Sequence, residues 1–276
     1  MINLDPIDTN TPDFGDLYDE LPLWSAPFGL WILDRVPLRP GQTVLDLGAG
    51  TGFLTVELAE RGGATTNVIA VDPWQAAMAR LQRKITQRKL TNVQLMVQDA
   101  AALALPDQSV DVIVSNLGVN NFDDPSAVLH MCSRAARPGA TFLLTTNLVG
   151  HMAEFYDVFR RVLQQAGRTD RLAALESHIQ HRANVVSLQA ALDEAGFDVV
   201  DSITDSFRLR FADGTALLNH FFIRLGFLPA WIAVAGAENT AQTFAALAQE
   251  LNAVAAARGE LALTIPTAGI VARRRG

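Results

Sequence analysis

The stretch TVLDLGAGTGFLTVELAERGG, residues 43–63, places three glycines within five positions, between an apolar run and a helical pattern. Glycine loses more backbone freedom on folding than any other residue. Gly48, Gly50 and Gly52 therefore weaken local structure unless another group must approach the main chain closely. A ligand is the usual reason for such an approach, so the stretch predicts a ligand-binding loop.

The sequence around this loop alternates between two patterns. Short apolar runs bounded by polar or turn residues predict buried strands at 43–48, 67–72, 92–99, 110–116 and 140–147. Helical periodicity lies between them, at 53–62, 74–90 and 124–139. Asp124 and Pro125 are typical of an N-cap and first turn, and Pro138-Gly139 predicts the end of that helix.

Repeated strand-helix units predict an α/β fold, with a parallel sheet and helices on both faces. In such a sheet a ligand binds beyond the carboxyl ends of the strands, where the strand order reverses. The glycine stretch follows the first strand, as that rule requires. It also opens a helix whose free backbone N–H groups can bind an anion.

Composition restricts the class of protein. The 276 residues are 49% hydrophobic and 18% charged, which is typical of a soluble globular chain with one core and added segments. The net charge of −7 argues against a nucleic-acid partner. The most apolar stretch, residues 225–237, is too short to span a bilayer of about 30 Å. We expect no membrane span.

The cysteine count and the first residues predict a compartment. Cys132 is the single cysteine, which excludes an intrachain disulfide and a thiolate zinc site. The sequence also contains no H-x-x-x-H pattern or carboxylate cluster, so no metal is expected. The first residues are acidic and polar, unlike a signal peptide. We therefore expect a cytoplasmic protein.

Glycine spacing separates two classes of nucleotide. A dinucleotide fingerprint reads G-x-G-x-x-G, whereas here the third glycine comes one residue early and Asp46 precedes the first. The resulting pattern, D-x-G-x-G-x-G, resembles the first motif of the class I S-adenosylmethionine-dependent methyltransferases. A nicotinamide oxidoreductase of Rossmann fold stays as an alternative, and so does a non-catalytic regulatory protein that binds the cofactor without turnover.

The resemblance implies S-adenosylmethionine as cofactor, S-adenosylhomocysteine as product, and a role for each strand end. Asp72 would accept both ribose hydroxyls, Asp99 would receive the adenine amino group, and Asn116 would lie beside the methionine part. Trp74 would either stack on the adenine or pack against the sheet. The full set assigned to the cofactor is Asp46, Gly48, Ala49, Gly50, Gly52, Asp72, Pro73, Trp74, Asp99, Ala100 and Asn116.

The family likeness also implies a Rossmann-like seven-stranded sheet, mostly parallel with an antiparallel last strand, flanked by helices. Residues 187–211 fit a helix, a Gly-Phe turn and the sixth strand, and residues 262–275 fit the seventh. The expected arrangement is a single methyltransferase domain, residues 1–276. Its core comprises about 41–147, 187–211 and 261–276.

The remaining segments, about 1–40, 148–186 and 212–260, are expected to form a helical lid. The second and third leave from the side of the sheet that carries the glycine loop. Their amphipathic and apolar sequences predict an enclosed, largely apolar chamber for a small acceptor. An alternative interpretation is that these helices only bury their apolar faces against each other.

Polar and aromatic residues near the expected opening are candidates for the acceptor site: Tyr18, Trp24, Asn120, Asn121, Asn147 and His151. His151 is the candidate for proton transfer, because an imidazole pKa suits a general base. Methyl transfer itself requires mainly alignment, exclusion of water and charge stabilisation. No catalytic residue is needed if the acceptor is already an anion.

Two groups within the class share further stretches with this chain. VSNLGV, RLRFADGTALLNHFFIRLGF and LTIPTAGIVARR are similar to the enzymes that methylate the free carboxyl of a malonyl carrier protein. The first motif and RAARPGATFLLTT are similar to the quinone C-methyltransferases. These likenesses imply direct in-line transfer to an oxygen or carbon atom. They leave a carrier protein open as a partner, and the sequence does not determine the oligomeric state.

Overall fold

The structure, a computed structural model, describes residues 2–9, 11, 13–19, 22–180 and 182–276. The chain forms two compact units. The helical unit comprises Met1–Asp8, Asn147–Ala183 and Asp205–Pro266. The sheet unit comprises Thr9–Thr146, Asn184–Thr204 and Thr267–Gly276.

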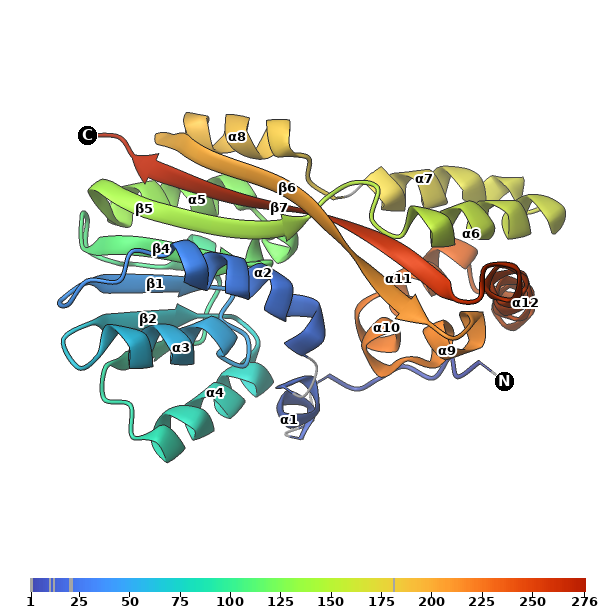
Figure 1. The fold of residues 1–276 in the computed structure, drawn as a ribbon, viewed down its shortest axis with the longest axis horizontal. Helices are drawn as coiled ribbons and strands as arrows, with labels where there is room; N and C mark the ends of the chain where they lie inside the picture. Colours follow the sequence, from blue (N-terminus) through green and yellow to red (C-terminus); the bar gives the residue numbers. More distant parts are fainter. Residues whose placement is uncertain (1, 10, 12, 20–21, 181) are drawn as a thin grey trace. The chain divides into compact units, whose positions relative to one another are not determined.

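Seven strands form one sheet in the order β3-β2-β1-β4-β5-β7-β6 (Figure 1). Strands β1 to β5 pair in parallel, and β7 runs opposite to its neighbour β6 in the view of Figure 1. This confirms the predicted Rossmann-like seven-stranded sheet. The strands are β1 (Thr43–Leu47), β2 (Asn67–Val71), β3 (Val93–Met96), β4 (Val110–Asn116), β5 (Ala136–Asn147), β6 (Phe197–Phe211) and β7 (Leu261–Arg274).

The central strands form because their side chains are buried on both faces. In β1, β2 and β4 the residues are mostly Val, Ile and Leu, and nearly every position is buried. Continuous apolar runs of this kind are typical of a parallel sheet covered by helices. The strand order reverses between β1 and β4, which places a switch point at the carboxyl end of β1.

Helices cover the sheet as the sequence predicted. On one face, buried residues of α2 (Pro22–Arg35) and α3 (Phe53–Gly62) pack on Val44, Val68 and Val112 of the strands. The crossover from β4 to β5 runs the other way along the sheet, so its helix α5 (Pro125–Ala135) covers the opposite face. The sheet unit also contains α1 (Phe14–Asp19), α4 (Gln75–Arg88), η1 (Ala100–Ala102), η2 (Gly118–Asn121) and α8 (Val185–Glu194).

Two strand boundaries differ from the predicted ones. β3 ends at Met96, short of the expected Asp99, because residues 97–99 leave the ladder before η1. β5 begins at Ala136 and includes Pro138-Gly139, although α5 does end just before it, at Ala135. A register shift in the pairing of β4 with β5 lies between Val110 and Val112. Proline is tolerated at such an irregularity because it has no N–H to donate to the ladder.

The helical unit is built around aromatic side chains. Phe155 stacks on Trp231 with ring centroids 3.9 Å apart, and Phe159 lies 6.2 Å from Phe244. All four are fully buried. The helices of this unit are α6 (Ala153–Gln165), η3 (Thr169–Arg171), α7 (Leu172–Gln180), α9 (Gly214–Asn219), α10 (Phe221–Gly226), α11 (Leu228–Ala235) and α12 (Thr240–Arg258).

The predicted lid segments fall into both units. Residues 148–183 and 212–260 belong to the helical unit, whereas 9–40 and 184–186 belong to the sheet unit. The covering of a ligand site by these helices stays a prediction. Across the described residues, the structure contains no helix long and apolar enough to cross a membrane.

Candidate functional site

The glycine loop turns tightly at the carboxyl end of β1. Gly48 and Ala49 both donate their backbone N–H to the carbonyl of Val71, over 2.9 and 3.1 Å. Gly50 has φ of +54° and Gly52, the N-cap of α3, has φ of +89°, in the left-handed region that favours glycine. The loop therefore follows the carboxyl end of β1, as the sequence predicted, and it is hydrogen-bonded to the end of β2.

The two glycines differ in what surrounds them. A Cβ on Gly50 would meet no atom within 4 Å, so its missing side chain leaves open space. A Cβ on Gly52 would lie 2.2 Å from Leu81 Cδ1, so Gly52 permits the packing of α3 against α4. Gly50 therefore leaves the main chain accessible, whereas Gly52 is required for the packing of α3 against α4.

Gly118, which the sequence analysis missed, faces the glycine loop from the end of β4. A Cβ on Gly48 would lie 3.0 Å from the Cα of Gly118. Leu117, just before it, is buried and has φ of +64°. A left-handed leucine is uncommon, and such backbones concentrate at functional sites. The glycine in SNLGV, directly after a predicted strand, was the signal that could have found it.

Asp72 fixes the shape of the loop. Its two carboxylate oxygens accept hydrogen bonds from the backbone N–H groups of Gly50 and Trp74, over 2.9 and 2.8 Å. Burial raises the pKa of Asp72, and the two backbone hydrogen bonds oppose that rise. Each oxygen keeps a lone pair, so the carboxylate can still accept from a ligand.

Asp46 is a fully buried acid on β1. Its carboxylate accepts a hydrogen bond from the Thr55 hydroxyl, over 2.6 Å. Burial raises the pKa of Asp46 to about 7; the hydrogen bond from Thr55 opposes this, and the neighbouring carboxyl of Asp72 adds to it. Two acids beside the glycine loop make this place favourable for a cation.

Asp46 is expected to make stability depend on pH. Its pKa is 3.8 ordinarily and about 7 in the folded chain, so between these values the folded state binds more protons than the unfolded state. Asp46 should therefore contribute a fall of about 2.5 kcal/mol in the free energy of unfolding between pH 5 and pH 8, and the lowered pKa of His151 contributes a rise that offsets part of it. Asp46→Asn keeps an oxygen for Thr55 but cannot ionise, so the variant should become more stable relative to the wild type by about 2.5 kcal/mol over this pH range.

Urea unfolding of the ligand-free protein at pH 5, 6, 7 and 8 checks this slope. Asp34→Asn, which changes an exposed acid, serves as the matched control and should retain the wild-type slope. An Asp46→Asn variant whose stability varies with pH as that of the wild type does would contradict the assignment.

A cavity opens beside the glycine loop within the sheet unit. Its lining includes six residues that the sequence assigned to a ligand site: Tyr18, Asp46, Gly48, Ala49, Gly50 and Asn116. It also includes four that the sequence analysis missed, namely Ser25, Thr51, Phe53 and Leu54. The cavity holds about 70 Å³, whereas ligand pockets commonly hold about 300–1,000 Å³. A nucleoside would therefore require the lining side chains to move.

The first helix is held beside the glycine loop by ion pairs. Asp19 of α1 pairs with Arg80 of α4 over 3.0 Å and also with Lys84. Lys84 in turn donates to the carbonyl of Thr51 over 2.9 Å. Burial and the charge of Asp72 raise the pKa of Tyr18, so its hydroxyl stays protonated. The N-terminal segment is thus tied to the loop through α4.

Trp74 contacts aromatic residues of α1. Its ring lies 4.9 Å from that of Tyr18, edge to face, and 5.5 Å from that of Phe14. Trp74 precedes α4 as its N-cap residue and is half-buried. Its stacking on an adenine stays a prediction.

The other predicted residues of the sheet unit lie at the strand ends. Asp99 is exposed and caps η1 by accepting from Ala101 N over 2.6 Å, and Ala100 is buried in that turn.

Asn116 donates to the carbonyl of Ser25 over 3.2 Å and accepts from Thr145 over 3.0 Å. Thr146 donates to Asn120. Asn121 and Pro73 are exposed, and Trp24 lies 6.0 Å from Phe28.

Asn147 and His151 belong to the helical unit, where both are buried. The Tyr156 hydroxyl lies 3.4 Å from His151 Nε2 and 3.1 Å from His178 Nε2, and Trp231 Nε1 donates to it over 3.3 Å. Burial and the charge of Arg182 lower the pKa of His151 to about 3. The imidazole is therefore neutral at pH 7. Tyr156, His178 and Arg182 were missed, because sequence spacing does not show which helices meet.

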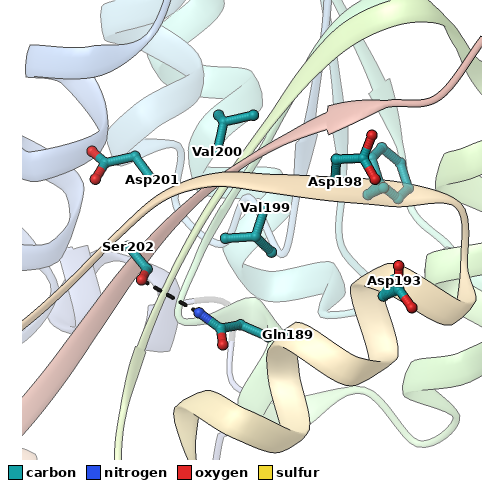
Figure 2. Close-up of a pocket in the computed structure, with 8 residues that line it drawn as sticks. Gln189, Asp193, Asp198, Val199, Val200, Asp201 and Ser202 are labelled. Atoms are coloured by element: carbon teal, nitrogen blue, oxygen red, sulfur yellow. Dashed lines mark hydrogen bonds between the residues drawn. The ribbon is translucent and has the colours of Figure 1, made fainter.

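A larger groove lies between α8 and β6, with a volume of about 580 Å³ (Figure 2). Three aspartates, Asp193, Asp198 and Asp201, line it, and Gln189 donates to Ser202 over 3.4 Å. None of its residues is a predicted site residue. Its lining is acidic and contains no glycine, unlike the cavity beside the glycine loop.

Comparison with known proteins finds relatives in sequence and in fold. The Methyltransferase domain family matches residues 45–144, which span β1 to most of β5. The ubiquinone/menaquinone biosynthesis C-methyltransferase of Escherichia coli is 28% identical over 179 residues, covering 61% of this chain and 71% of that protein.

Solved structures share the fold at low identity. An S-adenosylmethionine-dependent methyltransferase of Aquifex aeolicus aligns with a TM-score of 0.54 and 20% identity, over 70% of this chain and 92% of that one. Phosphoethanolamine N-methyltransferase 2 of Haemonchus contortus, in complex with S-adenosylmethionine, aligns with a TM-score of 0.58 and 18% identity. This alignment covers 98% of this chain and 58% of that one.

Proposed function

Because the chain is a class I S-adenosylmethionine-dependent methyltransferase, we propose that it methylates a small, largely apolar acceptor at an oxygen or carbon atom by direct in-line transfer. The observation that carries the proposal is the glycine loop at the switch point, with open space at Gly50 and the acids Asp46 and Asp72 beside it. Carbon as the acceptor atom is supported by the curated C-methyltransferase that the chain resembles.

The residues at the loop fit the cofactor chemically. Bare main chain at Gly50 accepts close approach of a ligand, and the spare lone pairs of Asp72 suit the two hydroxyls of a ribose. The sulfonium is a cation, and buried carboxyls stabilise a positive charge when they ionise. We propose that Asp46, Gly48, Ala49, Gly50, Gly52, Asp72, Pro73, Trp74, Asp99, Ala100 and Asn116 hold the cofactor.

When bound, S-adenosylmethionine supplies an electrophilic methyl carbon, so the protein need only align an acceptor, exclude water and stabilise changing charge. Tyr18 and Asn116 line the cavity and are suited to orienting ligand groups. We also propose acceptor contacts for Trp24, Asn120, Asn121, Asn147 and His151. A His151 pKa of about 3 makes this imidazole a weak base, which favours a hydrogen-bonding role over proton abstraction.

Two measurements test the proposal. Native mass spectrometry of the purified protein should show bound S-adenosylmethionine or S-adenosylhomocysteine. Incubation with S-adenosylmethionine and panels of phenols, quinols, enols and acids should then release S-adenosylhomocysteine with at least one acceptor. Cofactor binding without any release across all panels would support the non-catalytic alternative instead.

A further inference from the structure

The helical unit contains a buried polar cluster that the cofactor site does not use. His151, Tyr156, His178 and Arg182 form it, with Trp231 and Phe227 as aromatic walls. The segment that carries Arg182 lies beside the turn before His151, because Val149 donates its backbone N–H to the carbonyl of Ala183 over 3.1 Å. The cluster therefore joins residues from separate parts of the unit.

Two atoms of this cluster are buried without a hydrogen-bond partner among the described residues: His151 Nδ1 and Arg182 Nε. His151 is 1% exposed and Arg182 is half-buried. Buried polar atoms are nearly always paired, and an unpaired one costs about 1–3 kcal/mol. Two such atoms in one cluster indicate a missing hydrogen-bond acceptor.

The charge around Arg182 is also uncompensated. Within the described part of the chain, no carboxylate forms an ion pair with this guanidinium, and its charge acts on Tyr156 and His151. Other arginines of the helical unit do have such partners, for example Arg160 with Glu176 over 2.7 Å and Arg210 with Glu260 over 2.5 Å. A half-buried guanidinium without a counter-ion can form charge-assisted hydrogen bonds to an anionic ligand.

One arrangement of protons satisfies all three contacts of the Tyr156 hydroxyl. The Tyr156 hydroxyl donates to His151 Nε2 and accepts from Trp231 Nε1 and from His178 Nε2. The neutral His151 ring then carries its proton on Nδ1, which makes this atom a donor. His151 Nδ1 and Arg182 Nε are then both N–H donors, and a carboxylate has two oxygens that accept such bonds.

We propose that His151 and Arg182 bind a carboxylate between Nδ1 and Nε, with Tyr156 and His178 as positioning residues that set the tautomer of His151. The site lies within the helical unit, and its ligand is a small molecule that carries a carboxylate.

Benzoate is the probe, and benzamide is its neutral isostere. Calorimetric titration of the full chain should show that benzoate binds about tenfold or more tightly than benzamide, because the hydrogen bonds to the carboxylate are charge-assisted. Arg182→Gln should weaken benzoate binding about tenfold or more and leave benzamide nearly unchanged. His151→Phe, which keeps an aromatic ring, should weaken benzoate binding several-fold.

Arg210→Gln is the matched control, since it removes an exposed, ion-paired arginine from the same unit and should leave benzoate binding unchanged. Circular dichroism verifies that each variant folds. Nitrogen-15 NMR of His151 distinguishes ligand binding from a purely structural role. Benzoate should change the chemical shift of Nδ1 in the wild type, which a structural role would not predict.

Equal binding of benzoate and benzamide, no detectable benzoate binding, or an Arg182→Gln variant with wild-type affinity would each overturn the proposal. Titration with S-adenosylmethionine is run on the same samples. If the wild type does not bind S-adenosylmethionine, the proposed function is refuted. The benzoate result still decides whether the carboxylate site exists.

Discussion

Asp72→Asn is expected to weaken the binding of S-adenosylmethionine about a hundredfold, which corresponds to about 3 kcal/mol. In the wild type, both carboxylate oxygens accept from backbone N–H groups, one from Gly50 and one from Trp74. An asparagine has a single oxygen, so one of these donors would face an amide NH₂ group. The variant therefore loses the loop geometry together with one acceptor for the ribose.

Isothermal titration calorimetry measures the change in affinity, and circular dichroism shows that the variant is folded. Asp107→Asn is the matched control, because Asp107 is an exposed acid of the same unit that pairs with Arg134 over 2.6 Å. It should bind the cofactor as the wild type does. A folded Asp72→Asn protein with unchanged affinity would show that this carboxylate serves the loop alone.

Gly50→Leu is expected to abolish measurable cofactor binding, a loss of more than about a hundredfold, while the protein stays folded. A Cβ at this position meets no protein atom within 4 Å, so the leucine would fill the space proposed for the ligand. The left-handed backbone at φ of +54° costs a non-glycine residue about 1–2 kcal/mol of stability.

Gly52→Ala provides the contrast. Its Cβ would lie 2.2 Å from Leu81 Cδ1, so even a methyl group overpacks the contact of α3 with α4. We expect a loss of about 3 kcal/mol in the free energy of unfolding, measured by urea denaturation. Gly50→Leu should therefore have a large effect on cofactor affinity and a small one on the free energy of unfolding. This contrasts with the large loss of stability expected for Gly52→Ala. Retained cofactor binding by Gly50→Leu would mean that the loop is only structural.

The sequence predicted the elements around the glycine loop closely. β1, β2, β4 and α3 follow their predicted ranges within a residue or two, because their apolar runs and helical periodicity are strong local signals. Asp124 caps α5 through its side chain, as its place before Pro125 indicated. β5 was less predictable, since Pro138-Gly139 ends the helical pattern and yet lies within the strand.

Side-chain partners were harder to predict. Asp72 was predicted to be a site residue, but its two hydrogen bonds to Gly50 and Trp74 depend on how the loop closes. Gly118, which follows β4, faces Gly48 although it lies 70 residues further along the chain. The cluster of Tyr156, His178 and Arg182 depends on helix packing that no spacing rule describes.

The sequence by itself determined the parallel sheet, the position of the glycine loop and the class of cofactor, because each depends on residues that are close together in the chain. Only the tertiary structure decided which glycine faces open space, how Asp46 comes to have a pKa of about 7, and which buried atoms lack partners. The physical reason is that desolvation, close packing and hydrogen bonding depend on neighbours in space, and folding brings those neighbours from distant parts of the sequence.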